Sequence, residues 1–101
     1  MNLSQEEWAE QFKNDDNAFL LDVRTPEEFE EVHIPGATNI DIHKGQGFVY
    51  EVDELDKSKN FYVYCRSGAR SAKACEVLNQ LGVANTYNLL GGILDWKGET
   101  E

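Results

Sequence analysis

The residue best placed to do chemistry in this chain is Cys65, which follows a short run of aromatic and β-branched residues at positions 62–64. The residues after it are small or basic, and a helical pattern starts at Ala72. This order predicts a strand that ends at the cysteine, then a tight loop, then a helix whose N-terminus points back at the sulfur. Backbone N–H groups and a helix N-terminus stabilise a thiolate and any anion attached to it. We therefore predict that Cys65 is a nucleophile.

The charge pattern around Cys65 is opposite to that of the whole chain. The 101 residues include 19 Asp and Glu against 9 Lys and Arg, which gives a formal net charge of −10. No acidic residue occurs from Lys57 to Cys75, whereas five basic residues do. The sequence thus predicts an electropositive surface around the sulfur. The overall negative charge argues against partners that require a basic surface, namely nucleic acids and anionic membranes.

The second cysteine, Cys75, falls inside the helical pattern, and we expect it to pack in the core; the alternative is a resolving thiol. Two cysteines and two distant histidines, His33 and His43, lack the spacing of a metal site, so no metal is expected. The first residues have neither a basic region nor an apolar core, and no apolar run could span a membrane. A cytoplasmic protein with reduced cysteines is the expectation.

Short apolar runs alternate with helical patterns along the chain. Two capping boxes, Ser4 with Glu7 and Thr25 with Glu28, predict the starts of the first two helices. Further helices are expected at 48–55, 72–81 and 93–97, and strands at 19–23, 38–40, 61–64 and 86–89. Apolar strands of this kind are buried on both faces. We therefore predict one α/β domain, residues 1–101, with a central parallel sheet and helices on both faces.

Functional groups in such sheets gather at the carboxyl ends of the strands. Residues 22–24 follow one predicted strand and residues 65–70 follow another, so the two loops should meet at one site. With its residues placed in this way, the chain resembles the rhodanese family over most of its length. The motifs that carry the resemblance are Leu-Asp-Val-Arg at 21–24, Glu-Phe at 28–29, His-Ile-Pro-Gly-Ala at 33–37, Tyr-Cys-Arg-Ser-Gly-Ala-Arg-Ser at 64–71, Leu-Gly-Gly at 90–92, and Trp96.

The resemblance implies a rhodanese-like α/β fold in its single-domain version and a cysteine that carries sulfane sulfur as a persulfide. The spacing of the loop supports sulfur chemistry independently. Cysteine-dependent phosphatases, including those on a rhodanese-like fold, place five residues between the cysteine and the arginine that cradle a phosphate. Four residues lie between Cys65 and Arg70, and a smaller loop encloses a smaller anion. Sulfur transfer is therefore favoured over phosphatase or arsenate reductase activity.

Four basic or titratable residues near the site have alternative roles. Arg66 is either a solvated loop residue or, in the interpretation that we favour, a charge that guides an anionic donor or stabilises the thiolate. Thiosulfate-type relatives often have a second basic residue next, where this chain has Ser67. Arg70 either ties the loop to Asp22 or to backbone carbonyls, or supplies site charge. Arg24 either lines the pocket or pairs with Asp22. His33 is expected to make a structural hydrogen bond, because a loop-stabilised thiolate needs no general base.

The function that the sequence favours is a thiosulfate-type sulfurtransferase that acts through a Cys65 persulfide and passes the sulfur to cyanide or a thiol. No metal or organic cofactor is expected. The alternative is a relay module that delivers persulfide sulfur to a protein partner. The residues predicted to bind substrate and persulfide are Arg66, Ser67, Gly68, Ala69 and Arg70, with Arg24 as a candidate pocket residue.

Overall fold

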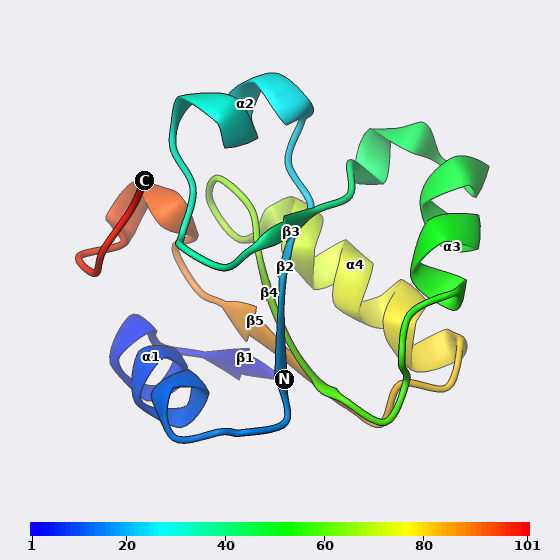
Figure 1. Ribbon diagram of the computed structural model, residues 1–101, viewed down its shortest axis with the longest axis horizontal. Coiled ribbons are helices and arrows are strands. Elements are labelled where there is room, and N and C mark those ends of the chain that lie inside the picture. The colour runs from blue at the N-terminus through cyan, green and yellow to red at the C-terminus, as the bar shows by residue number, and fades with distance from the viewer.

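The computed structural model describes residues 1–101 and contains one five-stranded sheet, in which all neighbouring strands are parallel and the order is β1-β5-β4-β2-β3 (Figure 1). This confirms the predicted α/β class. The strands are β1 (Asn2–Leu3), β2 (Ala18–Asp22), β3 (Thr38–Asn39), β4 (Asn60–Tyr64) and β5 (Asn85–Leu89). The helices are α1 (Gln5–Lys13), α2 (Pro26–Glu31), α3 (Gln46–Asp53) and α4 (Ala69–Gln80), with 3₁₀ turns η1 (Ile42–Lys44) and η2 (Ile93–Asp95).

The two faces of the sheet are covered by different helices, as Figure 1 shows. On one face α3 and α4 pack against alternate residues of the central strands, including Leu21, Phe61 and Val63. On the other face Trp8 of α1 packs with Leu20, Tyr62, Tyr64 and Leu89. Successive strand residues point to opposite faces, so the continuous apolar runs reflect burial on both sides.

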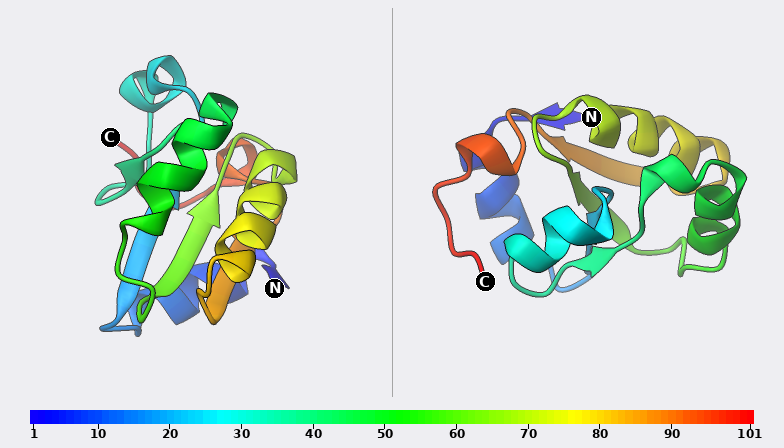
Figure 2. Two further views of the ribbon diagram at one scale, coloured as in Figure 1. Left: turned by 90° about the vertical axis from the view of Figure 1, so that its right-hand side faces the viewer. Right: turned by 90° about the horizontal axis from the view of Figure 1, so that it is seen from above.

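Helix α2 covers neither face and buries none of its own residues fully. Its N-cap Thr25 accepts a hydrogen bond from Glu28 N–H, and the Glu28 side chain accepts one from Thr25 N–H, so the predicted capping box is present. Figure 2 shows α2 above the end toward which the β4 arrow points. It therefore stands over the carboxyl ends of the strands, beside the residues that follow β4.

Helix α4 begins at Ala69, three residues before the predicted start at Ala72. Its N-cap is Gly68, whose φ of +108° lies in the left-handed region that favours glycine. The chain can therefore turn sharply at Gly68 and enter the helix at once. Arg70 and Ser71 consequently belong to the first helical turn and not to the loop.

Two short elements were not predicted from the sequence. Strand β1 pairs with the edge of β5, and η1 occupies part of a segment without a clear pattern. β1 has only two residues, of which only Leu3 is buried, so no alternation of polar and apolar residues could reveal it. No helix in the structure has both the length and the apolar character needed to cross a membrane.

Candidate active site

The Cys65 sulfur lies directly after β4 and is almost completely buried, with 1% of the residue exposed. It accepts a hydrogen bond from Gly68 N–H at 3.0 Å and lies 3.3 Å from the Ser71 hydroxyl. Burial disfavours the thiolate, but the Ser71 hydroxyl and the backbone N–H groups of Ser71, Gly68 and Ser67 outweigh it. The pKa of the Cys65 thiol is therefore lowered from its ordinary value. These donors give the sulfur the environment of a reactive cysteine.

Asn88 forms a buried polar network with Ser71 and Gly68, the two residues that contact the sulfur. The Ser71 hydroxyl lies 2.5 Å from Asn88 Oδ1, and Asn88 Nδ2 donates to Gly68 O at 3.2 Å. Asn88 is 2% exposed and lies in β5, among apolar residues of the core. It thus links the two groups that contact the sulfur. Sequence reasoning missed Ser71 and Asn88 as site residues, although an asparagine near the carboxyl end of a buried strand was a usable signal.

The chain after β5 holds the other side of the cysteine loop. Ile93 N–H donates to Cys65 O, and Leu94 N–H donates to Arg66 O, both at 3.0 Å. Gly92 makes this approach possible: its φ is +60°, and a Cβ at this position would clash with the carbonyl groups of Cys65 and Arg66. Gly92 is thus required for close backbone packing.

Arg70 pairs with an acidic residue of α2. Its two terminal nitrogens donate to the two carboxylate oxygens of Glu28 at 2.9 and 3.0 Å. This pairing holds the pKa of Glu28 well below its ordinary value, at about 2, despite partial burial. The predicted partner of an inward-turned Arg70 was Asp22 or a backbone carbonyl; the partner in the structure is Glu28. Arg70 therefore ties α4 to α2.

Arg24 is 3% exposed and pairs with Asp22, which is completely buried. Its guanidinium donates to both Asp22 carboxylate oxygens and to Val32 O, and it lies 5.5 Å from the centre of the Tyr64 ring. Arg24 also lines the pocket described next. The sequence left two roles open for Arg24, lining the pocket or pairing with Asp22, and the structure shows both. The side chain forms part of the pocket wall, and Asp22 compensates its charge.

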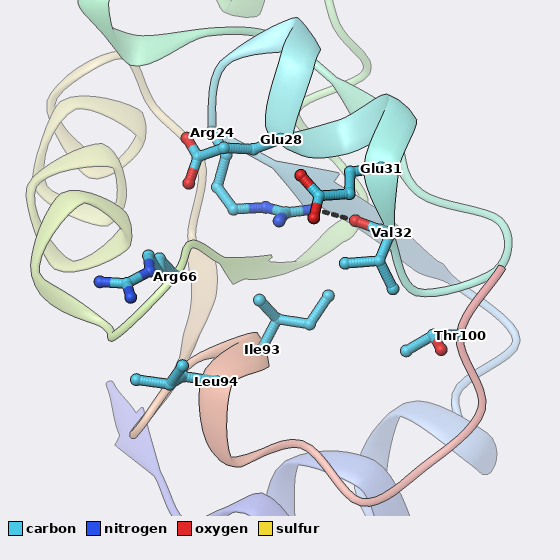
Figure 3. Close-up of a pocket in the computed structure, with 8 residues that line it drawn as sticks. All are labelled: Arg24, Glu28, Glu31, Val32, Arg66, Ile93, Leu94 and Thr100. Atoms are coloured by element: carbon cyan, nitrogen blue, oxygen red, sulfur yellow. Dashed lines mark hydrogen bonds between the residues drawn. The ribbon is translucent and has the colours of Figure 1, made fainter.

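A cavity of about 370 Å³ opens beside the cysteine loop. Figure 3 shows its lining, which comes from the end of β2, from α2, from the cysteine loop and from η2. The lining residues are Arg24, Glu28, Glu31, Val32, Arg66, Ile93, Leu94 and Thr100. The two loops that the sequence placed at the carboxyl ends of β2 and β4 do meet at this cavity.

The charge at the cavity is more balanced than the sequence pattern indicates. The stretch around Cys65 lacks acidic residues, but the fold brings Glu28 and Glu31 of α2 against it. Glu28 compensates Arg70, and Asp22 compensates Arg24. Arg66 is exposed and forms no ion pair. The electropositive surface expected from sequence is thus reduced to one uncompensated cation on the pocket wall.

The remaining candidate residues lie away from the sulfur. Cys75 is buried in the core against α3 and β4, and burial raises the pKa of its thiol. Both cysteines are free. His33 Nδ1 lies 2.8 Å from Phe29 O, consistent with the structural hydrogen bond expected for it. No group of three or more potential metal ligands occurs in the structure.

Comparison with known proteins shows which family the chain belongs to. Residues 5–99 match the Rhodanese-like domain. The chain belongs to the rhodanese-like family. It is 39% identical over 93 residues to the putative sulfurtransferase YtwF of Bacillus subtilis, covering 91% of this chain and 85% of that relative. It is 32% identical over 99 residues to the putative sulfur carrier protein YrkF of the same organism, covering 98% of this chain but only 52% of that relative.

A solved structure shares the fold of this rhodanese-like chain. The crystal structure of a rhodanese-like domain protein from Staphylococcus aureus superposes with a TM-score of 0.81 at 28% identity, covering 97% of this chain and 92% of that one. The family that the sequence motifs predicted, and the rhodanese-like architecture, are both confirmed.

Proposed function

We propose that this rhodanese-like protein is a sulfurtransferase that carries a sulfane sulfur on Cys65. The observation that carries the proposal is the set of N–H and O–H donors around a buried sulfur whose pKa is lowered. Such donors stabilise a thiolate that attacks and a persulfide that is itself anionic. The similarity to a putative sulfurtransferase and to a putative sulfur carrier protein supports the same chemistry.

In the first half of the reaction, the Cys65 thiolate attacks the outer sulfur of thiosulfate. A bond forms between Cys65 Sγ and that sulfur, the sulfur–sulfur bond of thiosulfate breaks, and sulfite leaves with the bonding electron pair. The backbone N–H groups of residues 66–70 hold the resulting persulfide anion. Arg66, exposed and uncompensated at the mouth of the cavity, attracts the anionic donor.

In the second half, cyanide or a thiol attacks the outer sulfur of the persulfide, and Cys65 leaves as a thiolate. No residue outside the loop is required as a base, because the nucleophile is already ionised when its pKa is low. Two free cysteines are compatible with a reducing compartment such as the cytoplasm, where the chain is proposed to act.

A second candidate function is a persulfide relay, in which Cys65 delivers its sulfur to a protein partner and reacts poorly with small donors. The similarity to a putative sulfur carrier protein, of which this chain spans about half the length, favours this candidate. Leu94, in the wall of the cavity beside the cysteine loop, is an exposed apolar side chain that a partner protein could cover.

Intact-mass analysis tests the proposal. Exposure to thiosulfate should add one sulfur atom, about 32 Da, at Cys65. We expect Cys65→Ala to abolish the addition and Cys75→Ser to retain it. Parallel exposure to a cysteine persulfide and to a persulfide-loaded protein separates the two candidates, because the relay accepts sulfur from the protein and little from thiosulfate. Sulfur addition that persists in Cys65→Ala would overturn the assignment of the nucleophile.

A further inference from the structure

The Ser71 hydroxyl beside the Cys65 sulfur has one hydrogen and two neighbours that could receive it. Its oxygen lies 3.3 Å from Cys65 Sγ and 2.5 Å from Asn88 Oδ1. A serine hydroxyl donates only one hydrogen bond, although its oxygen can also accept. The hydroxyl therefore cannot donate to the sulfur and to the amide oxygen at the same time.

The orientation of the Asn88 amide decides which neighbour receives the hydrogen when the sulfur is uncharged. Asn88 Nδ2 donates to the carbonyl oxygen of Gly68 at 3.2 Å and to Asn2 Oδ1 at 3.0 Å. The Gly68 carbonyl can only accept, so the NH₂ group must face it. The amide oxygen consequently faces Ser71, and because this oxygen can only accept, the Ser71 hydroxyl donates to it.

Ionisation of Cys65 changes the best position for this hydrogen. A neutral thiol can donate its S–H to the Ser71 oxygen, and the hydroxyl then keeps its hydrogen bond to Asn88. After the thiol proton has left to solvent, the thiolate is the stronger acceptor, because hydrogen bonds to charged groups are stronger than those to neutral ones. The hydroxyl turns to the sulfur, and Asn88 Oδ1, on a residue that is 2% exposed, loses its partner. Asn88 thus opposes ionisation.

A sulfur atom bound to Cys65 restores the first arrangement. In a persulfide anion the negative charge lies on the outer sulfur, whereas Cys65 Sγ is bonded to two atoms and is uncharged. The Ser71 hydroxyl can then return to Asn88 Oδ1. Asn88 therefore stabilises both the thiol and the persulfide relative to the thiolate.

We propose that Asn88 is a positioning residue that acts through the Ser71 hydrogen, opposing the thiolate form of Cys65 and favouring the persulfide form. For the persulfide form, this assignment rests on the proposed function. When the thiolate takes the outer sulfur of thiosulfate, a sulfur–sulfur bond forms and sulfite leaves with the electron pair of the bond that breaks. The Ser71 hydroxyl turns from Sγ to Asn88, and its hydrogen stays on the same oxygen throughout.

Other ionisable groups surround the sulfur on several elements. They are Arg66 in the loop, Arg70 and Cys75 on α4, Glu28 and Asp41 near Arg70, and the Asp22–Arg24 pair at the end of β2. Helix α3 faces the same core with the uncharged Phe48 and Val52, and β5 contains no charged residue. None of these groups is hydrogen-bonded to the Ser71 hydroxyl or to the Asn88 amide. An effect of Asn88 that requires Ser71 therefore does not come from them.

Asn88→Leu removes the amide at nearly the same side-chain size. We expect it to lower the pKa of the Cys65 thiol, because the Ser71 hydrogen is then free to donate to the thiolate. A merely structural role for Asn88 predicts the opposite shift, since a loosened loop presents fewer donors to the sulfur. The pH dependence of alkylation by iodoacetamide, in the Cys75→Ser background, measures the shift. In a Ser71→Ala protein, Asn88→Leu should leave this pKa unchanged.

Asn79→Leu is the matched control. Asn79 Oδ1 accepts a hydrogen bond from the Thr86 hydroxyl across the same interface between α4 and β5, near the other end of the helix. The substitution removes the same kind of contact without touching the residues around the sulfur. Its alkylation profile should coincide with that of the parent protein.

The equilibrium between loaded and unloaded protein gives an independent measurement. The ratio of the two forms is read by intact mass at a fixed ratio of thiosulfate to sulfite, at a pH where unloaded Cys65 is ionised. Asn88→Leu should lower this ratio about two- to tenfold, the equivalent of one hydrogen bond. Asn79→Leu should leave it unchanged.

The wild-type protein offers a test that needs no substitution at Asn88. The NMR resonance of the Asn88 side-chain carbonyl carbon should shift as Cys65 ionises and should return toward its thiol-state position when Cys65 is loaded with sulfur. In Ser71→Ala most of this shift should be absent, because only the field of the nearby charge remains.

A pKa that is raised or unchanged in Asn88→Leu, or lowered equally in the Ser71→Ala background, would overturn the inference and leave the sulfurtransferase proposal in place. If Asn88→Leu does not fold, a wild-type carbonyl resonance that does not respond to ionisation has the same consequence. A wild-type protein that takes up no sulfur on Cys65 would instead overturn the proposed function and the persulfide part of the inference, and the alkylation profiles would still decide the thiolate part.

Discussion

The Cys65 sulfur shows how a buried cysteine can remain ionisable. Removing a thiolate from water costs free energy, and burial raises the pKa of Cys75 although its thiol has a hydrogen-bond partner in Thr86. Cys65 is equally inaccessible but receives donors from Gly68 and from both the backbone and the hydroxyl of Ser71. The difference between the two cysteines is therefore one of hydrogen-bond supply and not of burial.

Ser71→Ala should raise the pKa of the Cys65 thiol, because the largest of the effects that lower it is the Ser71 hydroxyl. The rise follows from the loss of one hydrogen bond to a charged group. The rate of alkylation by iodoacetamide, measured against pH in the Cys75→Ser background, reports this pKa directly.

Ser67→Ala provides the matched control for that measurement. Ser67 contributes its backbone N–H to the sulfur, and an alanine retains that donor. Its alkylation profile should therefore coincide with that of the parent protein. A Ser71→Ala profile that also coincides with the parent would show that the backbone donors alone set the thiol pKa.

At the scale of elements, the ion pair between Glu28 and Arg70 joins α2 to the first turn of α4. α2 buries no residue completely, so this contact and the Arg24 hydrogen bond to Val32 O are among the few that hold it over the sheet. The cavity wall that α2 supplies, Glu28 and Glu31 included, depends on them.

Glu28→Gln should destabilise the protein by roughly 1–2 kcal/mol at pH 7, because a bidentate charged pair is lost while glutamine can still complete the capping box. The pKa of Glu28 is depressed from 4.5 to about 2 in the folded protein. Its contribution to stability is therefore fully present above about pH 4.5 and is lost as the pH falls toward 2.

Urea unfolding of both proteins at pH 7, 5, 4 and 3 measures this difference. The gap in unfolding free energy should be constant from pH 7 to pH 5 and should narrow at pH 4 and 3. A gap that is the same at all four values would mean that the effect does not come from the Glu28 charge.

Gly92→Ala tests how closely the chain after β5 must approach the cysteine loop. A methyl group there meets the Cys65 and Arg66 carbonyls and also disfavours the backbone φ of +60°. We expect a loss of about 1–3 kcal/mol in unfolding free energy and slower sulfur loading of Cys65.

Gly36→Ala is the comparison for that variant. Gly36 also has a positive φ, +87°, but a Cβ there has no neighbour within 4 Å. Gly36→Ala should lower the unfolding free energy through the unfavourable backbone conformation alone. It should leave the rate of sulfur loading of Cys65 equal to that of the parent protein. If Gly36→Ala slows loading as much as Gly92→Ala does, the close approach at Cys65 is not the cause.

Much of this architecture could be predicted because it depends on local patterns. Apolar runs and capping boxes identified β2, β4, β5, α1 and α2 to within a few residues, and the family motifs marked the cysteine loop. The partner of Arg70 was not predictable in this way, since Glu28 lies 42 residues earlier and only the fold places it there. The position of Asn88 near the end of a strand could be read from the sequence, but its partner could not, because the hydrogen bond that the Ser71 hydroxyl donates to it crosses from α4 to β5.

At the scale of the whole molecule, the charge distribution opposes an anionic donor at long range and attracts it only at close range. The net charge of −10 is spread over the chain, and α2 adds carboxylates beside the cavity. Arg66 is the free cation next to Cys65. Long-range repulsion acts beyond the Debye length, about 10 Å at 0.1 M salt, and is screened first.

Moderate added salt should therefore leave thiosulfate turnover unchanged or raise it slightly in the parent protein. In Arg66→Ala the short-range attraction is absent, and kcat/KM for thiosulfate should fall roughly tenfold, as expected for the loss of one charge-assisted contact. Measuring kcat/KM for both proteins across a salt series, with an uncharged sulfane-sulfur donor as control, separates charge from loop structure. If Arg66→Ala slows the uncharged donor as much as thiosulfate, Arg66 shapes the loop and does not attract the donor. If salt instead slows the parent protein steeply, short-range attraction outweighs the repulsion from the negative surface.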